Sequence, residues 1–269
     1  MTRHSRYWAA HTTKELAAMD ADRVIAVLPG AAIEQHGPHL PLSVDADIGA
    51  AVVERLAERL PVALPVLFLP PLPVGVSPEH ADFAGTLSLS AETMLRVLAE
   101  IGASVAATGV RKLVLLNTHG GNPQVLDLAA QALRRERKML VFPLNAYRYW
   151  RAEDLFDVHE TAHGIHGGAV ETSIMQAIAP DEVRADEVRK FPSRSEEMAG
   201  DYAHLRPFGR IASFGWQTQD LNPDGAVGDA TLADADKGGR LLDTAVATLV
   251  EILGEIDDLS PDVLVDRER

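Results

Sequence analysis

The chain has 269 residues, a formal net charge of −14 and a sequence pI near 5.1. This charge repels a nucleic-acid backbone, so we expect no nucleic-acid partner. The chain contains no cysteine, which excludes disulfides, thiolate metal sites and cysteine nucleophiles. A cysteine-free chain fits the reducing cytoplasm, where we expect the protein to be located. With 46% hydrophobic residues, the chain can bury the core of a globular protein.

No stretch of the sequence predicts export or insertion into a membrane. Residues 1–20 lack the apolar core of a secretory signal. The most apolar stretch, residues 60–76, is interrupted by prolines such as Pro65 and Pro70 and is too short for a membrane helix. It predicts a buried strand that runs into a rigid loop, and we expect no membrane partner.

Strands and helices alternate along the chain. Apolar runs predict strands at residues 24–28, 66–69, 113–116 and 139–144. Amphipathic patterns predict helices at residues 45–60, 90–105, 123–133, 168–178 and 232–256. Helices between strands imply parallel pairing, so the sequence predicts an α/β fold, a three-layer α/β/α sandwich with a mostly parallel central sheet.

We find no internal repeat and no linker, and we therefore expect a single domain over residues 1–269. Residues 181–230 show no long periodic segment, and Gly, Pro, Asn and Asp abound at residues 222–229. This segment predicts either an ordered loop over a site or a contact between subunits.

Polar loops leave several predicted strands at the same end. In an open α/β sheet, ligands gather outside the carboxyl ends of the strands. Loops 29–45, 70–90 and 117–122 all lie there, so we expect their polar side chains to meet in one crevice. The first of these loops carries Glu34, His36, His39, Asp45 and Asp47.

These loops and the predicted helix at 168–178 supply ligands for divalent metal ions. Without cysteine, a metal site has to use imidazole and carboxylate groups, which suit hard and borderline metals. Two divalent ions that one carboxylate bridges lower the pKa of a shared water and polarise a carbonyl group. Asp45 is the candidate bridge because it lies at a helix start, although a helix cap and a single bound ion are alternatives. The candidates are Glu34, His36, Asp45, His119, His166 and Glu171.

Four segments resemble the signature blocks of the creatininase (creatinine amidohydrolase) family, in the same order. They are IEQHGPHLPL followed by Asp45, HADFAGTLSL, LVLLNTHGGN and HGGAVETS. The resemblance implies a three-layer α/β/α fold, a binuclear site for Zn or Mn, with Fe as a third option, and hydrolysis of an amide-like C–N bond. It also implies a homo-oligomer, often a hexamer.

Carried over by position, the resemblance gives the site residues their roles. Glu34 and His119 would bind one ion, His36 would bind the other, and Asp45 would bridge them. His166 matches the histidine that moves protons in catalysis. This role agrees with its chemistry, because an imidazole near neutrality can take a proton from water and pass it to a leaving nitrogen.

The sequence departs from creatininase itself at two places. Creatininase has a metal-binding glutamate two residues after the histidine that matches His119, whereas this chain has Gly121. Glu171 is the natural replacement, either as a ligand at the catalytic centre or as a partner of His166. Where creatininase places tryptophans around its substrate, this chain has Tyr147 and Ala162, so creatinine is not the expected substrate.

A small-molecule substrate is the expected partner of the site. For two of the substrate-binding candidates, Glu79 and His80, bracing of the loop is an equal alternative. Gly120 and Gly121 precede a predicted helix but form no nucleotide-binding pattern, so we expect no nucleotide cofactor. The substrate-binding candidates are Glu79, His80, Gly120 and Tyr147.

The sequence therefore predicts a metal-dependent hydrolase that acts on carbon–nitrogen bonds other than peptide bonds. The expected substrate is a small molecule, namely a cyclic amide, a formamide or a short peptide. One alternative keeps the metals but opens a cyclic ketone in sugar or inositol catabolism. Another is a metal-binding scaffold that has lost hydrolysis, since a fold does not guarantee an activity. Gly121 supports the scaffold, whereas His166 and Glu171 count against it.

Overall fold

A computed structural model describes residues 6–209 and 212–265 of the chain. Its centre is a four-stranded parallel sheet with the strand order β2-β1-β3-β4. The strands are β1 (Ile25–Gly30), β2 (Val66–Phe68), β3 (Lys112–Asn117) and β4 (Leu140–Asn145). Because all four strands run in the same direction, their carboxyl ends lie along one edge of the sheet.

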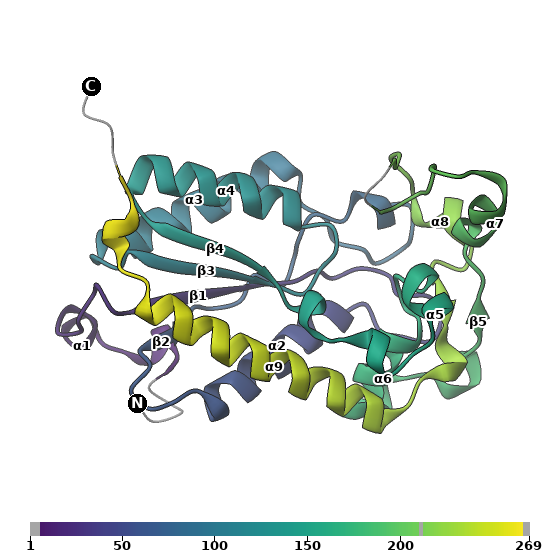
Figure 1. The fold of residues 1–269 in the computed structure, drawn as a ribbon, viewed down its shortest axis with the longest axis horizontal. Helices are drawn as coiled ribbons and strands as arrows, with labels where there is room; N and C mark the ends of the chain where they lie inside the picture. The colour runs from purple at the N-terminus through teal and green to yellow at the C-terminus, as the bar shows by residue number, and fades with distance from the viewer. Residues whose placement is uncertain (1–5, 210–211, 266–269) are drawn as a thin grey trace.

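Helices cover both faces of this sheet (Figure 1). One face carries α3 (Ala91–Ala107) and α4 (Pro123–Arg137), and the other carries α2 (Val44–Arg59) and α9 (Ala235–Asp258). The helix α6 (Ala169–Ile178) packs on α9 and α2. Side chains of β1 alternate between the two cores. Ile25 and Val27 pack with α2 and α9, while Ala26 and Leu28 pack with α3 and α4. These layers confirm the predicted α/β/α sandwich.

Short elements lie beyond the carboxyl ends of the strands (Figure 1). They are α5 (Val158–His163), α7 (Arg194–Asp201), α8 (Thr218–Leu221) and an antiparallel pair of β5 (Lys190–Phe191) with β6 (Gly228–Asp229). Most of them belong to residues 181–230, the segment without long periodicity. Near the N-terminus, α1 (Thr13–Ala17) lies at the opposite end of the sheet (Figure 1).

The predicted elements are present, and their ends differ by a few residues. Pro29 and Gly30 extend β1 beyond the predicted run because they continue its pairing with β3, opposite Leu116 and Asn117. That the elements form a single domain stays a prediction. Within the described residues, no helix combines the length and the apolar character needed to cross a membrane.

The packing of α9 on α6 allows a stability test at two adjacent glycines. A Cβ on Gly238 would overlap the backbone carbonyl of Ser173, whereas nothing lies within 4 Å of a Cβ on Gly239. We expect Gly238→Ala to lower the free energy of unfolding by about 1–3 kcal/mol through overpacking. Gly239→Ala should raise it by about 0.5–1 kcal/mol, since alanine favours the helix. Urea denaturation measures both, and similar effects of the two substitutions would contradict this packing.

Candidate active site

Three histidines each have one ring nitrogen held by a backbone carbonyl oxygen. Since a carbonyl oxygen can only accept, each of these nitrogens carries the proton and donates it. The other nitrogen of each ring is thereby turned toward the carboxylates at the edge of the sheet. The donors Nδ1 of His36, Nε2 of His119 and Nε2 of His166 lie 3.0, 2.9 and 2.6 Å from the carbonyl oxygens of Glu34, Val76 and Gln35.

Two groups of potential metal ligands share one carboxylate. Nδ1 of His119 lies 3.2 Å from Oε1 of Glu34 and 3.1 Å from Oδ2 of Asp45. Nε2 of His36 lies 3.7 Å from Oδ1 of Asp45 and 3.9 Å from Oε2 of Glu171. Within each group, the ligand atoms lie within 4.8 Å of one another. Asp45 therefore faces both groups, one with each oxygen.

The donor set at these groups fits divalent metal ions. Oε2 of Glu34 and Nε2 of His36 are buried and have no hydrogen-bond partner. A buried polar atom without a partner is costly, and a cation would supply the partner for both. Carboxylate oxygens together with imidazole nitrogens suit Zn and Mn.

The carboxylates raise the pKa of the histidines that face them. Burial alone would lower the pKa of His36, but Asp45, Glu171 and Glu34 raise it to about 9. Burial also opposes the charge of His119, yet Glu34 and Asp45 hold its pKa well above the ordinary value. Burial raises the pKa of Glu171 to about 7. Without a bound ion, His36 and His119 thus carry protons on the nitrogens that would bind a metal ion.

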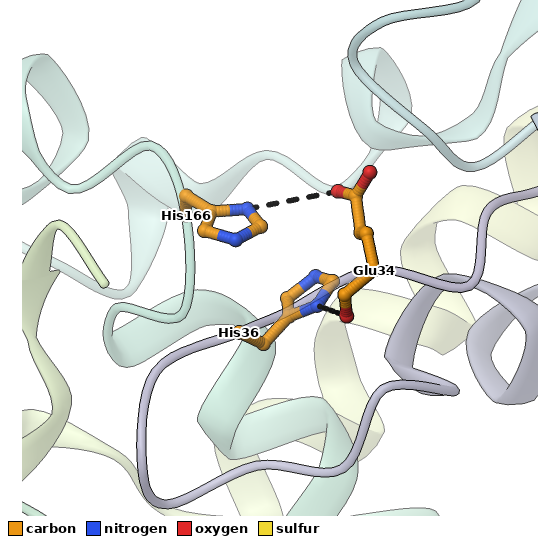
Figure 2. Close-up of side chains that lie close together, drawn as sticks. All are labelled: Glu34, His36 and His166. Carbon is orange, nitrogen blue, oxygen red and sulfur yellow. Dashed lines mark hydrogen bonds and ion pairs between the residues drawn. The ribbon is translucent and has the colours of Figure 1, made fainter. Parts of the chain in front are cut away.

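His166 differs from these two because its neighbours are imidazoles. Its ring lies between those of His36 and His80, with centroid distances of 4.1 and 4.2 Å. Burial and these neighbours hold its pKa well below the ordinary value, so the ring is neutral. Its unprotonated Nδ1 lies 3.9 Å from Oε1 of Glu34. Figure 2 shows the His166 ring turned toward this carboxylate. His166 also forms a possible ligand group with Glu34 and His36, so it lies directly beside the centre.

The ends of β1 and β3 and the start of α2 bring these side chains together. Glu34 and His36 follow β1, and His119 follows β3. Asp45 lies in the first turn of α2, where Ser43 is the N-cap residue and makes no side-chain capping bond. The Asp45 carboxylate is directed to the histidines, which favours the ligand over the helix cap.

Two asparagines hold the loop after β3. Oδ1 of Asn117 accepts from the backbone N–H of His119 at 3.1 Å and from Nδ2 of Asn122 at 3.0 Å. Asn122 also accepts from the N–H of Val76 at 3.0 Å and donates to the carbonyl of Ala31 at 3.2 Å. Asn122 precedes α4 as predicted, but its side chain joins three loops instead of capping the helix.

Gly121 has no room for a side chain. A Cβ on this residue would overlap the carbonyl oxygen of Val76 and would lie 2.5 Å from Nε2 of His119 and 2.7 Å from Oε1 of Glu79. The carboxylate of Glu79 thus occupies the space above the glycine. Glu171, in contrast, belongs to a group of potential ligands with His36 and Asp45. The residue proposed to replace the missing glutamate therefore lies beside these candidate ligands.

No role for Gln35 was predicted from the sequence. The only feature that could have indicated one was its position between two candidate ligands, Glu34 and His36. Its side-chain amide donates to Nδ1 of His80 at 2.7 Å and to the carbonyl of Gly225 at 2.8 Å. His80 therefore carries its proton on Nε2, which lies 3.4 Å from Oε1 of Glu34. Burial lowers the pKa of His80 to about 4, so the ring stays neutral.

A cavity of about 700 Å³ opens onto the centre. Sequence reasoning missed Trp150, Phe208 and Trp216 in its wall, although Trp150 belongs to the aromatic stretch after β4. The latter two come from residues 181–230, which favours the ordered loop over a site. Among the described residues, Ala162 does not line the cavity. All four predicted substrate-binding residues do: Glu79, His80, Gly120 and Tyr147.

His39 and Asp47 lie outside the centre. Nε2 of His39 is hydrogen-bonded to Oγ1 of Thr172 at 2.9 Å, and its ring stacks on Phe191 with a centroid distance of 5.1 Å. Asp47 accepts from Oγ of Ser43 at 2.6 Å. These two residues brace the loop and the start of α2.

The sheet, the cavity at its carboxyl edge and the cluster of carboxylates and imidazoles together place the protein among α/β enzymes. Residues 9–253 match the Creatininase family model, which is described as creatinine amidohydrolase. The chain belongs to the creatininase family and is a hydrolase. This confirms the family that the four sequence blocks predicted.

Relatives with different activities resemble the chain. A mycofactocin precursor peptide peptidase of Mycobacterium ulcerans is 35% identical over 80% of this chain and 78% of its own length. Creatinine amidohydrolase of Pseudomonas putida is 29% identical over 91% of this chain and 94% of its own length. A 3-dehydro-scyllo-inosose hydrolase of Thermotoga maritima is 26% identical over 95% of this chain and 85% of its own length.

Solved creatininase structures share the fold. A mutant creatininase of the Zn-Zn type superposes with a TM-score of 0.76 at 27% identity, covering 96% of this chain and 100% of its own. A creatininase described with Mn superposes with a TM-score of 0.74 at 27% identity, covering 94% of this chain and 99% of its own. The likeness extends over nearly the whole chain.

Metal binding should release protons and weaken as the pH falls. The pKa of His36 is raised to about 9, so its ring is protonated at neutral pH and must lose that proton to bind an ion. Below pH 9 we expect the apparent affinity to fall by up to about tenfold per pH unit for each proton released. Calorimetric titration with Zn²⁺ or Mn²⁺ in buffers of different ionisation enthalpy counts these protons. An affinity that is equal at pH 6 and pH 8 would contradict the assignment.

Proposed function

We propose that the protein is a metal-dependent amidohydrolase that cleaves an amide-type C–N bond of a small molecule by activating water. The observation that carries the proposal is the shared carboxylate of Asp45 at the floor of the cavity, between the group with Glu34 and His119 and the group with His36 and Glu171. Two divalent ions, Zn or Mn, would bind there. When bound, they would lower the pKa of a water molecule and polarise a carbonyl group.

The remaining residues have roles that follow from their protonation. His166 is neutral and turns Nδ1 toward the centre, so it would take a proton there and pass it to the leaving nitrogen. His80 turns an N–H toward Glu34 and the cavity, where it can donate to a substrate oxygen. Tyr147 and Trp150 line the cavity and would pack against the substrate. A scaffold without activity has no use for a neutral base beside its ions.

A short peptide is the substrate we favour among the candidates. A relative 35% identical to the chain is named as a peptidase of a precursor peptide, and one 29% identical is named as an amidohydrolase. Both names denote hydrolysis of an amide bond. A cavity of about 700 Å³ with aromatic walls has the size and the lining of a site for such a ligand.

Hydrolysis of a cyclic ketone is the second candidate function, because a relative 26% identical is named as an inosose hydrolase. A panel of short peptides, lactams, formamides and cyclic ketones, assayed with Zn, Mn and Fe, separates the two. Turnover of the ketones alone would overturn the amidohydrolase. The homo-oligomer implied by the family resemblance stays a proposal, which light scattering of the purified protein tests.

Replacement of His166 should separate proton transfer from metal binding. We expect His166→Asn to lower kcat by about 10²- to 10⁴-fold on the substrate that the panel identifies, since a general base is lost. The protein should retain bound metal, and His36→Ala should instead lose both metal and activity. His159→Ala is the control, because its ring is half-exposed and bonded to Glu196 at 3.0 Å. Wild-type turnover by His166→Asn would refute the role of this histidine.

A further inference from the structure

Glu160 of α5 is a buried carboxylate that is bound by backbone N–H groups. Its side chain is 2% exposed, and no cation among the described residues pairs with it. Oε1 accepts from the N–H of Ala169 at 2.7 Å, and Oε2 accepts from the N–H of Asp229 at 2.8 Å. A buried charge without a cation needs such hydrogen bonds, so this carboxylate holds two backbone segments to α5.

Three glycines make room for the carboxylate. A Cβ on Gly164 would overlap Oε1 of Glu160, and a Cβ on Gly168 or Gly228 would lie 2.6 or 2.8 Å from the same oxygen. Real Cβ atoms do not approach an oxygen so closely, so a side chain at any of these positions would displace the carboxylate. The backbone of three segments therefore encloses Glu160.

These segments carry the residues of one half of the candidate site. Gly164 and Gly168 lie on either side of His166, whose backbone N–H and C=O both pair with Val227, at 3.3 and 2.7 Å. Ala169 is the first residue of α6, the helix that presents Glu171 in its first turn. A displaced Glu160 would thus release the start of α6, which follows the His166 segment, and Asp229, which lies close to the Val227 backbone that pairs with His166.

The neighbours of Glu160 exclude a different interpretation. His159, Glu160 and His163 have the H-E-x-x-H spacing of zinc peptidases, in which both histidines bind zinc and the glutamate is the base. Here Nδ1 of His163 lies 2.7 Å from Oγ of Ser195, and Nε2 of His159 lies 3.0 Å from Oε2 of Glu196. Glu160 is directed away from them, into the protein. In this chain, the three residues with the H-E-x-x-H spacing therefore have structural roles.

We propose that Glu160 is a positioning residue for His166 and, through the start of α6, for Glu171 in the metal-ligand group with His36 and Asp45. The group of Glu34, Asp45 and His119 is built on β1, α2 and β3 and does not depend on it. This proposal rests on the proposed function, because it assigns a support to one of the two ion sites. It predicts that loss of Glu160 affects the two ions unequally.

The sharpest test is Glu160→Gln, which keeps the size of the side chain but replaces one acceptor by an NH₂ group that faces a backbone N–H. We expect one of the two ions to bind about 10- to 100-fold more weakly while the other keeps its affinity. Zn²⁺ titration with a competing chelator measures both. In turnover assays, kcat should fall by a similar factor with a smaller change in KM, because His166 is displaced.

Gly164→Ala reaches the same carboxylate from outside and keeps the proposal testable where Glu160→Gln does not fold. Its φ is negative, so alanine is allowed there, but the added Cβ meets Oε1 of Glu160. The matched control is Gly200→Ala in α7, where nothing lies within 4 Å of a Cβ. Glu197→Gln, an exposed carboxylate of α7, is the control for charge, and His159→Ala tests the zinc-peptidase interpretation. These three controls should bind both ions as the wild type does.

The outcomes separate this proposal from the proposed function. A wild-type protein without bound metal contradicts the proposed function. Amide hydrogen exchange then still tests the carboxylate, because Glu160→Gln or Gly164→Ala should speed exchange in residues 164–171 and 227–229. Two ions bound with wild-type affinity and unchanged exchange in both variants would overturn the positioning role. Loss of an ion in His159→Ala would support the zinc-peptidase spacing instead.

Discussion

Negative charge held out of water is the constraint on which the carboxyl edge of the sheet depends. Glu34 and Asp45 are almost fully buried, and an oxygen of each lies within 4.8 Å of the other beside the His119 ring that faces both. Carboxylates cannot stay ionised in such a place without cations nearby. In the ion-free protein, protonated His36 and His119 meet this need. Metal ions would take their place, so binding is an exchange of protons for metal at fixed positions.

The fixed positions come from backbone carbonyls and amide side chains rather than from the ligands themselves. Each of the three histidines has one nitrogen committed to a carbonyl oxygen, which selects the nitrogen that faces the centre. Asn122 and Gln35 join loops that are far apart in the sequence. Because these bonds orient the ligands through backbone and amide groups of the protein itself, less binding free energy is lost to ordering when an ion binds.

The sequence predicted the fold and the site best where a local hydrophobic pattern is followed by side chains with metal-binding chemistry. The strands β1, β2 and β3 are buried throughout and consist largely of apolar residues. The loops after β1 and β3 hold acidic and imidazole groups that a hydrophobic core would not accept, so both the sheet and the position of His119 could be predicted. The residues that support the candidate ligands, such as Gln35 and Glu160, could not be predicted. Gln35 and Glu160 act through backbone groups distant in the chain, and polar residues with such partners look like ordinary surface residues in a sequence. Trp216 lines the cavity from a segment without periodicity, so only the folded chain shows where it lies.

The space above Gly121 ties the backbone of one loop to the ring of a candidate ligand. A Cβ at position 121 would overlap the carbonyl oxygen of Val76 and would lie 2.5 Å from Nε2 of His119 and 2.7 Å from Oε1 of Glu79. A shorter side chain at position 79 would remove only the last of these contacts. A side chain at position 121 would therefore also have to displace the carbonyl of Val76 or the ring of His119, which are hydrogen-bonded to each other. The size of the residue at 121 and the ring nitrogen that His119 turns toward the centre are thus coupled.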